Sequence, residues 1–538
     1  MALRTCVSDG RLFRDYRYPL ILVGLAMALR IYLYFFTFII SRDGVSFLSI
    51  AQYFEQGEIT KGLGHDFHPF YSMMIAAGSY LVGDSQLTGQ IISIVAGSLL
   101  VVPVFCLGKS LFEEQVGFVA GLLAAFHPYL ARISADVLSD SLYIFFFASG
   151  ISAGWDALKR RRRLSFFLAG VYAAFAYLTR PEGIGILILV GFWVLMAGSR
   201  SFGIPARKVV ASFLLLVFGF LLFASPYLIY LRKETGHWIL TKKKSVGAII
   251  GIESKRTEFI DNMNSRTKAE KTSTQGGREA WTLADMSEPL HAEFFSVISI
   301  EVLKKVFKFF VKLTTTFHPI LFLFFLFGVY KSKKISGMDK RQWFILSFLF
   351  LYLPILYLLF LNIGYVSHRH LLPVFVIGLF WTAIGVQESR IWALRKVCEL
   401  NPLRRLSPNK VSSIVMILII AILLPMTLKP QRRDKIWIKQ AGLWITENCL
   451  INPKIMGYDS RIAYYAGGTN VETLAGYTFQ EIESVLESKE VDIVVLESHQ
   501  IDRDLSGSVS FGNKTLNPIH ELIDLKGRRF LVCRILDY

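Results

Sequence analysis

Apolar runs about as long as a membrane-crossing helix recur along residues 1–430 of this 538-residue chain. A helix needs about 20 apolar residues to cross the hydrocarbon core of a bilayer, and 53% of all residues here are hydrophobic. We therefore expect a mainly α-helical, polytopic membrane bundle of about eleven spans. The predicted spans cover residues 19–40, 86–108, 115–131, 137–156, 164–180, 183–199, 208–230, 314–331, 343–362, 371–387 and 411–428.

Basic residues lie mainly in the short connections between these spans. Clusters at 159–163, 331–341 and 390–410 all fall on one side of the membrane when the spans are counted in order. Short loops rich in Lys and Arg stay on the cytoplasmic side, so we expect an inner (plasma) membrane protein with its amino terminus inside and its carboxyl terminus outside. The formal charge of +18 then orients the chain. No nucleic-acid motif accompanies it, and we expect no nucleic-acid partner.

Two long connections on the predicted outer side interrupt the bundle. Residues 41–84 contain an apolar stretch too short to span, which we expect to lie in the membrane interface. Residues 236–300 contain a polar tract typical of a mobile loop that could close over a substrate. Directly afterwards, Lys304, Lys308 and Lys312 recur every fourth residue and form a basic stripe along one helix face. Membrane lipids with anionic headgroups are its natural partner.

The composition changes after about residue 430, where the apolar runs become short. Strand-like runs at 454–458, 492–496 and 530–536 are separated by a helical segment. We therefore expect residues 431–538 to form a small outer α/β domain and residues 1–430 to form the membrane domain.

Four acidic residues at predicted span ends are candidates for chemistry. Asp43 follows the first span, where a carboxylate at the boundary between water and membrane can stay ionised and act as a base. The alternative is a solvated helix-end residue paired with Arg42. Asp136 and Asp140 lie four residues apart, on one face if the helix is continuous, and could bind sugar hydroxyls or orient an acceptor. They could instead cap a helix start. Glu182 lies on the same side of the membrane.

Three arginines are candidates for binding a phosphate. Arg180 precedes Pro181, which ends the helix there, and its guanidinium could face a lipid phosphate bidentately. Glu182 could pair with Arg180 instead. Arg30 lies inside the first span, where a charge faces a polar cavity or pairs within the bundle. Arg369, at another outer span end, is a second candidate phosphate ligand, and the alternative for both span-end arginines is snorkelling to the headgroups.

Metal binding has weak support in the sequence. Two pairs of histidines, His65 with His68 and His368 with His370, could in principle build a site, but histidines in loops near membranes are seldom ligands. The five cysteines are scattered without metal-ligand spacing. We expect no metal and no cofactor. Two cysteines fall on the predicted outer side, where pairing is left open: Cys449 and Cys533.

A resemblance to a known superfamily rests on the order of five short features: Arg30, Asp43, His68–Pro69, Asp140 and Thr179–Gly183. In this order the chain resembles a polytopic GT-C glycosyltransferase. More narrowly, it is similar to bacterial relatives of the protein O-mannosyltransferases and of the lipid A aminoarabinose transferase. The resemblance covers roughly residues 15–390.

The resemblance implies an inverting glycosyltransferase that uses a polyprenyl-phosphate sugar as donor. It places the catalytic aspartate in the first outer loop, which here is Asp43. Protein O-mannosyltransferases carry Asp-Glu at this point, whereas Gly44 follows here, which puts a protein acceptor in doubt and leaves glycan, lipid and protein acceptors open. The first outer loop also lacks the Asp-x-Asp motif of oligosaccharyltransferases, and the outer domain lacks their Trp-Trp-Asp motif, which argues against a pyrophosphate donor with an obligatory metal. The substrate-binding candidates are Arg180, Glu182, Asp136, Asp140, His68, Arg30 and Arg369.

A transporter or flippase for lipid-linked sugars is the rival reading. It would also need intramembrane charges and a wide outer opening. Such transporters are commonly built from inverted repeats. This chain shows no inverted halves, and its outer domain is large, so we favour the glycosyltransferase.

Overall fold

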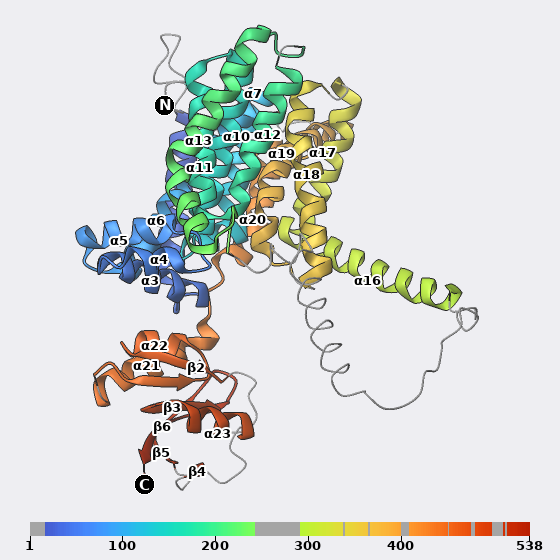
Figure 1. Cartoon of the computed structure of the whole chain (residues 1–538). Helices are drawn as coiled ribbons and strands as arrows, with labels where there is room; N and C mark the ends of the chain where they lie inside the picture. The colour runs from blue at the N-terminus through green and yellow to red at the C-terminus, as the bar shows by residue number, and fades with distance from the viewer. Residues whose placement is uncertain are drawn as a thin grey trace.

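The computed structural model describes residues 17–198, 200–242, 291–336, 339–363, 366–399, 408–449, 451–474, 479–497, 509–511 and 514–537. The molecule is elongated (Figure 1). A bundle of long helices occupies one end and a sheet with its own helices the other, and three short helices lie beside the bundle near the sheet. Most of the loop predicted at 236–300 lies outside the described residues.

Apolar helices make up the bundle. Within the described residues, five helices are long and apolar enough to cross a membrane, or up to seven if each of two bent pairs is one span. A multi-pass membrane protein is therefore supported, whereas the count of eleven spans stays a prediction. The bundle helices are α2 (Arg17–Phe35), α6 (Ser85–Leu99), α7 (Val101–Leu111), α8 (Glu114–Phe126), α9 (Pro128–Ser134), α10 (Asp140–Arg160), α11 (Arg163–Thr179), α12 (Ile184–Ala197), α13 (Ala206–Thr235), α16 (His291–Phe317), α17 (Pro319–Ser336), α18 (Lys340–Ile363), α19 (His368–Glu399) and α20 (Pro408–Leu428).

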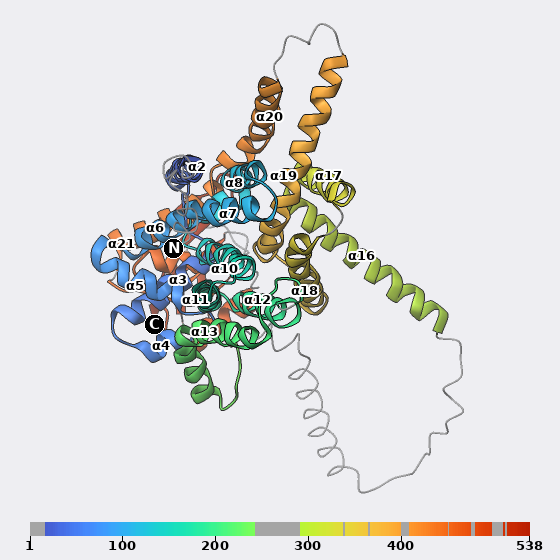
Figure 2. The same ribbon diagram turned by 90° about the horizontal axis from the view of Figure 1, so that it is seen from above.

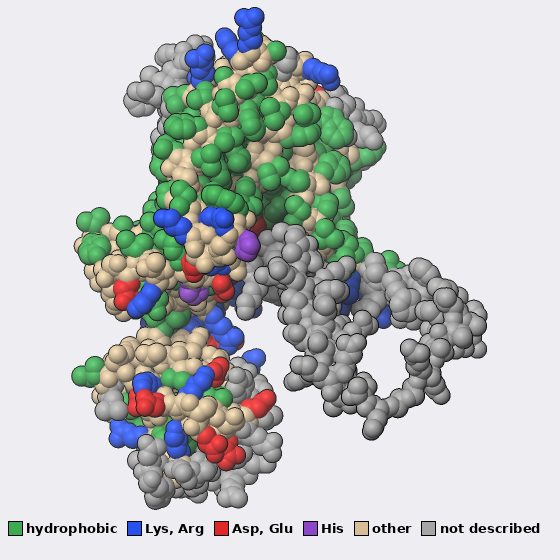
Figure 3. Space-filling model, viewed as in Figure 1, with side chains coloured by type: hydrophobic (Ala, Val, Ile, Leu, Met, Phe, Trp, Pro, Cys, Tyr) green, Lys and Arg blue, Asp and Glu red, His purple; other side chains and the backbone are tan. Residues whose placement is uncertain are grey.

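The surface of the bundle agrees with a membrane environment. Hydrophobic side chains cover the visible face of its helices (Figure 3). Lys and Arg side chains gather at the end of the bundle farthest from the sheet, as expected for a cytoplasmic end. The orientation in the membrane stays a prediction.

Two helix boundaries correct the predicted spans. The first span ends at Phe35 rather than at residue 40, because Thr37 leaves the helix and forms a β-bridge with Gln431. The span predicted at 314–331 starts only at Pro319. There the chain bends by 96° between α16 and α17, since proline lacks the N–H that would continue the α16 ladder.

A close crossing fixes α19 against α17. A Cβ on Gly328 of α17 would lie 1.8 Å from the Trp381 carbonyl oxygen, and one on Gly385 of α19 would lie 1.9 Å from the Phe324 carbonyl oxygen. Only glycine permits such an approach of two backbones. The crossing holds the helix that carries Arg369 at its first turn.

The first outer segment forms three short helices instead of a span. They are α3 (Arg42–Glu55), α4 (Ile59–Gly64) and α5 (Phe70–Val82), and they lie to one side of the bundle (Figure 2). The end of α5 exposes apolar side chains, with Tyr80 75% and Leu81 90% exposed. Exposed apolar side chains are typical of a helix that lies in the membrane interface, and that position of α5 stays a prediction.

The carboxyl-terminal unit is built around a six-stranded mixed sheet of order β2-β1-β3-β6-β5-β4. β1 pairs in parallel with β2 and β3, and the other pairs are antiparallel. Alternate residues of β3 and β6 pack against α21 and α22 on one face and against α23 on the other. The three predicted strands are present as β1 (Lys454–Gly457), β3 (Ile493–Glu497) and β6 (Arg529–Asp537); the other elements are β2 (Thr469–Thr473), β4 (Val509–Phe511), β5 (Lys514–Ile523), α21 (Ile436–Asn448), α22 (Arg461–Tyr465) and α23 (Phe479–Ser488).

Candidate active site

Asp43 lies in the first turn of α3, where the helix dipole favours a carboxylate. The N-cap residue Ser41 accepts a hydrogen bond from the Gly44 amide, at 3.0 Å. The Ser41 amide in turn donates to Asp136 Oδ1, at 3.1 Å. A Cβ on Gly44 would lie 3.0 Å from the Val137 carbonyl oxygen, so glycine lets the first turn of α3 approach this segment closely. The Asp43 side chain stays 37% exposed.

Arg180 is fixed by the turn that follows α11. Its backbone is extended, with φ −152° and ψ 139°, as the following proline requires. Pro181–Gly183 forms one turn of 3-10 helix, labelled η2. A Cβ on Gly183 would lie 2.2 Å from the backbone of Ala176, so the sharpness of this turn depends on glycine. The predicted helix end at Arg180 is confirmed.

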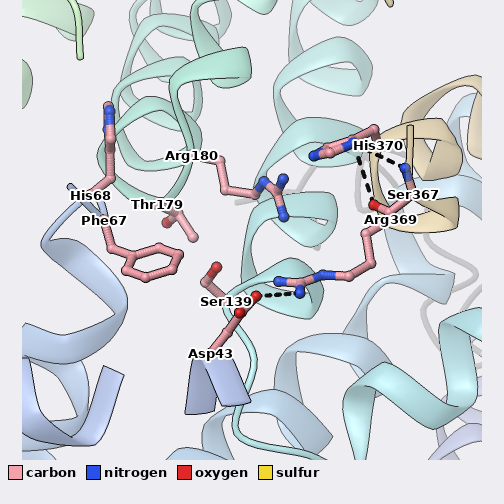
Figure 4. A pocket seen from close by; sticks show the side chains of 9 residues that line it. All are labelled: Asp43, Phe67, His68, Ser139, Thr179, Arg180, Ser367, Arg369 and His370. Atoms are coloured by element: carbon pink, nitrogen blue, oxygen red, sulfur yellow. Dashed lines mark hydrogen bonds and ion pairs between the residues drawn. The ribbon is translucent and has the colours of Figure 1, made fainter. Parts of the chain in front are cut away.

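Two carboxylates and two guanidinium groups form a connected network. Asp140, the first residue of α10, is 1% exposed and forms ion pairs with both Arg180 and Arg369. Arg369 Nη2 lies 2.6 Å from Asp140 Oδ2, and Nη1 lies 2.5 Å from Asp43 Oδ2. In Figure 4 the Arg369 guanidinium reaches Asp43, and the Arg180 guanidinium lies above it. The predicted residues Asp43, Asp140, Arg180 and Arg369 are thus brought together.

The network borders a cavity of about 310 Å³, which we call the charged cavity. Its walls come from α3, the turn before α5, the start of α10, the end of α11 and the start of α19. Polar groups predominate in its lining, and both arginines face into it (Figure 4). The lining residues are Asp43, Phe67, His68, Ser139, Thr179, Arg180, Ser367, Arg369 and His370.

Glu182 pairs with Arg180, and His68 binds the backbone of the helix end that precedes it. His68 is buried, and its Nδ1 donates to the Tyr177 carbonyl oxygen at 2.5 Å, in the last turn of α11. Glu182 Oε1 lies 3.3 Å from Arg180 Nη2, so the pairing that the sequence left open is present. The guanidinium also lies 5.7 Å from the centre of the Tyr143 ring, in cation–π contact. These contacts fix the direction of Arg180.

An apolar groove of about 540 Å³ adjoins the charged cavity. Pro69, Phe70 and Leu178 line the groove, and the residues beside them in sequence, His68 and Thr179, line the charged cavity. The rest of the groove is lined by α3, α4, α5, α11 and α13, almost entirely with aliphatic and aromatic side chains. Consecutive residues of the chain, at His68–Pro69 and at Leu178–Thr179, therefore line the charged cavity and the apolar groove.

Asp136 belongs to a second cluster of ion pairs, which joins the bundle to the carboxyl-terminal unit and which we call the anchor. Asp136 is fully buried, and its Oδ2 lies 2.5 Å from Arg432 Nη2. Asp459 binds Arg42 at 2.8 Å and Arg461 at 2.8 Å. Burial raises the pKa of Asp459, but its hydrogen bonds to Arg461 and Arg42 outweigh this effect and lower the pKa below its usual value.

Asp136 and Arg30 do not line the charged cavity. The helix expected to carry both Asp136 and Asp140 is broken: α9 ends at Ser134 and α10 begins at Asp140, so Asp136 faces the anchor instead. Arg30 is fully buried within α2, and its Nη1 donates to the carbonyl oxygens of Ala26 and Ala125 at 3.0 and 3.3 Å.

The sequence reasoning did not single out several residues that line the charged cavity. Each lies within two positions of a residue that it did select, so extending every candidate to its sequence neighbours would have found them. These residues are Phe67, Ser139 and Ser367.

Metal independence stays a prediction. Among the described residues, no group of three or more His, Cys, Asp or Glu side chains is placed to hold a metal ion. His368 is bonded to Thr316 and Tyr129 at 2.8 and 3.1 Å, away from the His65 and His68 pair. The sequence leaves a disulfide between Cys449 and Cys533 open, and in the structure both are free thiols.

Comparison of sequences links part of the chain to one family. Residues 66–230 match the sequence model of the dolichyl-phosphate-mannose-protein mannosyltransferases. This segment includes His68, Asp140, Arg180 and Glu182, but neither Asp43 nor Arg369. No curated protein sequence matches the chain.

Comparison of structures extends the likeness to nearly the whole chain. ArnT from Cupriavidus metallidurans, solved with bound undecaprenyl phosphate, matches with a TM-score of 0.55 at 11% identity over 96% of this chain and 98% of that chain. The oligosaccharyltransferase AglB from Archaeoglobus fulgidus, solved with an inhibitory peptide and a dolichol-phosphate, matches with a TM-score of 0.52 at 13% identity over 90% and 70%. At these identities the likeness concerns the fold.

Proposed function

We infer that this chain, which has the fold of the GT-C membrane glycosyltransferases, transfers a sugar from a polyprenyl-phosphate donor to an acceptor hydroxyl on the outer face of the membrane. The observation that carries this proposal is that neighbouring residues of the chain line the charged cavity and the apolar groove. A lipid phosphate carries a charged headgroup and an apolar tail, and these two surfaces match its two ends. The undecaprenyl phosphate in ArnT supports a donor of this class.

Asp43 is the proposed base. In a single displacement the acceptor oxygen attacks the anomeric carbon while its proton passes to the Asp43 carboxylate. The bond between the anomeric carbon and the phosphate oxygen breaks, and polyprenyl phosphate leaves with that electron pair. Attack opposite the leaving group inverts the anomeric carbon.

Arg180 and Arg369 are the proposed phosphate ligands. The diester donor carries one negative charge on its phosphate and gains a second when it leaves as a monoester, so guanidinium groups stabilise the products more than the donor. Arg369 is paired with Asp43 in the structure. A bound phosphate competes for Arg369, which leaves Asp43 free to accept the proton.

Product analysis tests this function. Purified protein is reconstituted with a panel of polyprenyl-phosphate sugars and a membrane extract as the source of acceptors, and new glycosides are identified by mass spectrometry. We expect a new glycosidic bond with inverted configuration and release of polyprenyl phosphate. Movement of intact lipid-linked sugar across the bilayer, with no new glycoside, would favour the flippase instead.

A further inference from the structure

A second, larger cavity of about 850 Å³ lies between α3, the turn before α6 and the carboxyl-terminal unit. We call it the polar cavity. One wall is a face of α3 and the other comes from α22 and the start of β2. Six of its lining residues represent the two walls: Ser46, Ser49 and Gln52 from α3, and Ser460, Tyr464 and Asn470 from the carboxyl-terminal unit.

The polar cavity lies next to the charged cavity at two points of the chain. Arg42 lines the polar cavity and the next residue, Asp43, lines the charged cavity. In the same way, His65 lines the polar cavity and Phe67 lines the charged cavity. A ligand in the polar cavity is therefore held beside the first turn of α3, which carries the proposed base.

Polar groups on both walls of the cavity are available to a ligand. Within the described residues, no hydrogen bond engages the side chains of Ser46, Ser49, Gln52 or Asn470. Hydroxyl and amide groups both donate and accept hydrogen bonds, and a polyhydroxylated ligand needs both.

The lining of the polar cavity disfavours anionic ligands and acyl chains. Its one arginine, Arg42, is already bound to Asp459, while Glu55 and Asp84 disfavour an anion. Two tyrosine rings, Tyr53 and Tyr464, supply the amphipathic surfaces of the lining. An acyl chain would leave the hydroxyl and amide groups without partners, at a cost in free energy.

We propose that the polar cavity binds the acceptor and that this acceptor is a neutral saccharide, which presents a hydroxyl to Asp43. The proposal rests on the proposed function and names its acceptor class. The carboxyl-terminal unit then forms one wall of the acceptor site.

A binding measurement that needs no transfer tests the cavity. Full-length protein in lipid nanodiscs is titrated with chitotriose and mannotriose, and saturation-transfer NMR reports binding. We expect at least one of them to bind, and the double variant Gln52→Ala/Asn470→Ala to bind about tenfold more weakly, because two amide groups are removed. The matched variant Gln115→Ala/Asn448→Ala removes the same groups from exposed positions outside the cavity and should bind like the wild type.

Ser49→Trp gives a second test, because the ring would fill the cavity from the α3 wall. We expect it to abolish saccharide binding while the thermal unfolding curve and donor binding stay unchanged. Failure of both trisaccharides to bind the wild type, or equal binding by both double variants, would overturn the proposal. Transfer to a peptide with no saccharide binding would also overturn it and leave the proposed function standing. Saccharide binding at this cavity without any transfer would instead contradict the proposed function alone.

Discussion

Two clusters of arginines and carboxylates flank the first turn of α3, and they differ in what surrounds them. In the anchor, Arg461 is 2% exposed, and its guanidinium donates to Asp459 and to the Ile40 carbonyl oxygen. Around the charged cavity, Arg180 and Arg369 form equally close ion pairs but also face empty space. The same residue types thus join two parts of the chain in one place and border a binding site in the other. The Asp459–Arg461 and Asp136–Arg432 pairs of the anchor line neither the charged nor the polar cavity, whereas Arg180 and Arg369 line the charged cavity, and this access to open volume separates the two roles.

The largest expected effect on transfer comes from changing Asp43, which is more exposed than Asp140, the other carboxylate paired with Arg369. Asp43→Asn keeps the shape of the side chain and removes the proton acceptor, so transfer should fall about 100-fold or more. Initial rates at saturating donor measure the loss, and Asp43→Glu should recover little, because the added length displaces the carboxylate. Near-normal turnover by a folded Asp43→Asn protein would place the base elsewhere.

A smaller effect is expected from Arg180→Ala. Loss of a charged hydrogen bond to the donor phosphate costs about 1.5–3 kcal/mol, which corresponds to roughly tenfold or more in donor affinity. The donor affinity of the reconstituted variant is compared with that of the wild type, and thermal unfolding of both is measured alongside. Unchanged donor affinity in a folded variant would reduce Arg180 to a structural partner of Asp140.

The matched carboxylate of the anchor should behave differently. Asp136→Asn removes the charge that pairs with Arg432 but keeps an acceptor for the Ser41 and Val137 amides. We expect a loss of about 1–3 kcal/mol in the free energy of unfolding and near-normal transfer per folded molecule. A large fall in transfer without any loss of stability would show that the two clusters are not separate in function.

The smallest effect on transfer is expected from Asp459→Asn, whose influence appears in the pH dependence of stability. The folded pKa of Asp459 is lowered below its unfolded value near 3.8, so its contribution to stability is present above that value and is lost as the pH falls through the folded pKa. Unfolding midpoints of the wild type should therefore decline more steeply below about pH 4 than those of the variant. Parallel curves would mean that Asp459 titrates alike in both states.

The sequence predicts the features that depend on local chemistry. The helix end at Arg180 follows from the adjacent proline, and the short helices of residues 41–84 follow from an apolar run that is too short to span. The pairing of Arg369 with Asp43 joins residues 326 positions apart, and no local pattern contains it. Asp136 was assigned by helical spacing, but the non-helical segment between Ser134 and Asp140 turns it toward Arg432. Long-range pairs of this kind are set by packing of the whole bundle.

The bend of 96° between α16 and α17 has a consequence for how the protein responds to its bilayer. Thr316, at the end of α16, is hydrogen-bonded to His368, directly before Arg369. Lys304 and Lys308 are exposed on α16, as are Leu303 and Phe307, so this helix has both a basic and an apolar face for the membrane surface. We expect this helix to tie the height of Arg369 to the membrane surface, while the height of a bound lipid phosphate follows the thickness of the lipid layer. We expect turnover to pass through a maximum as acyl-chain length is varied.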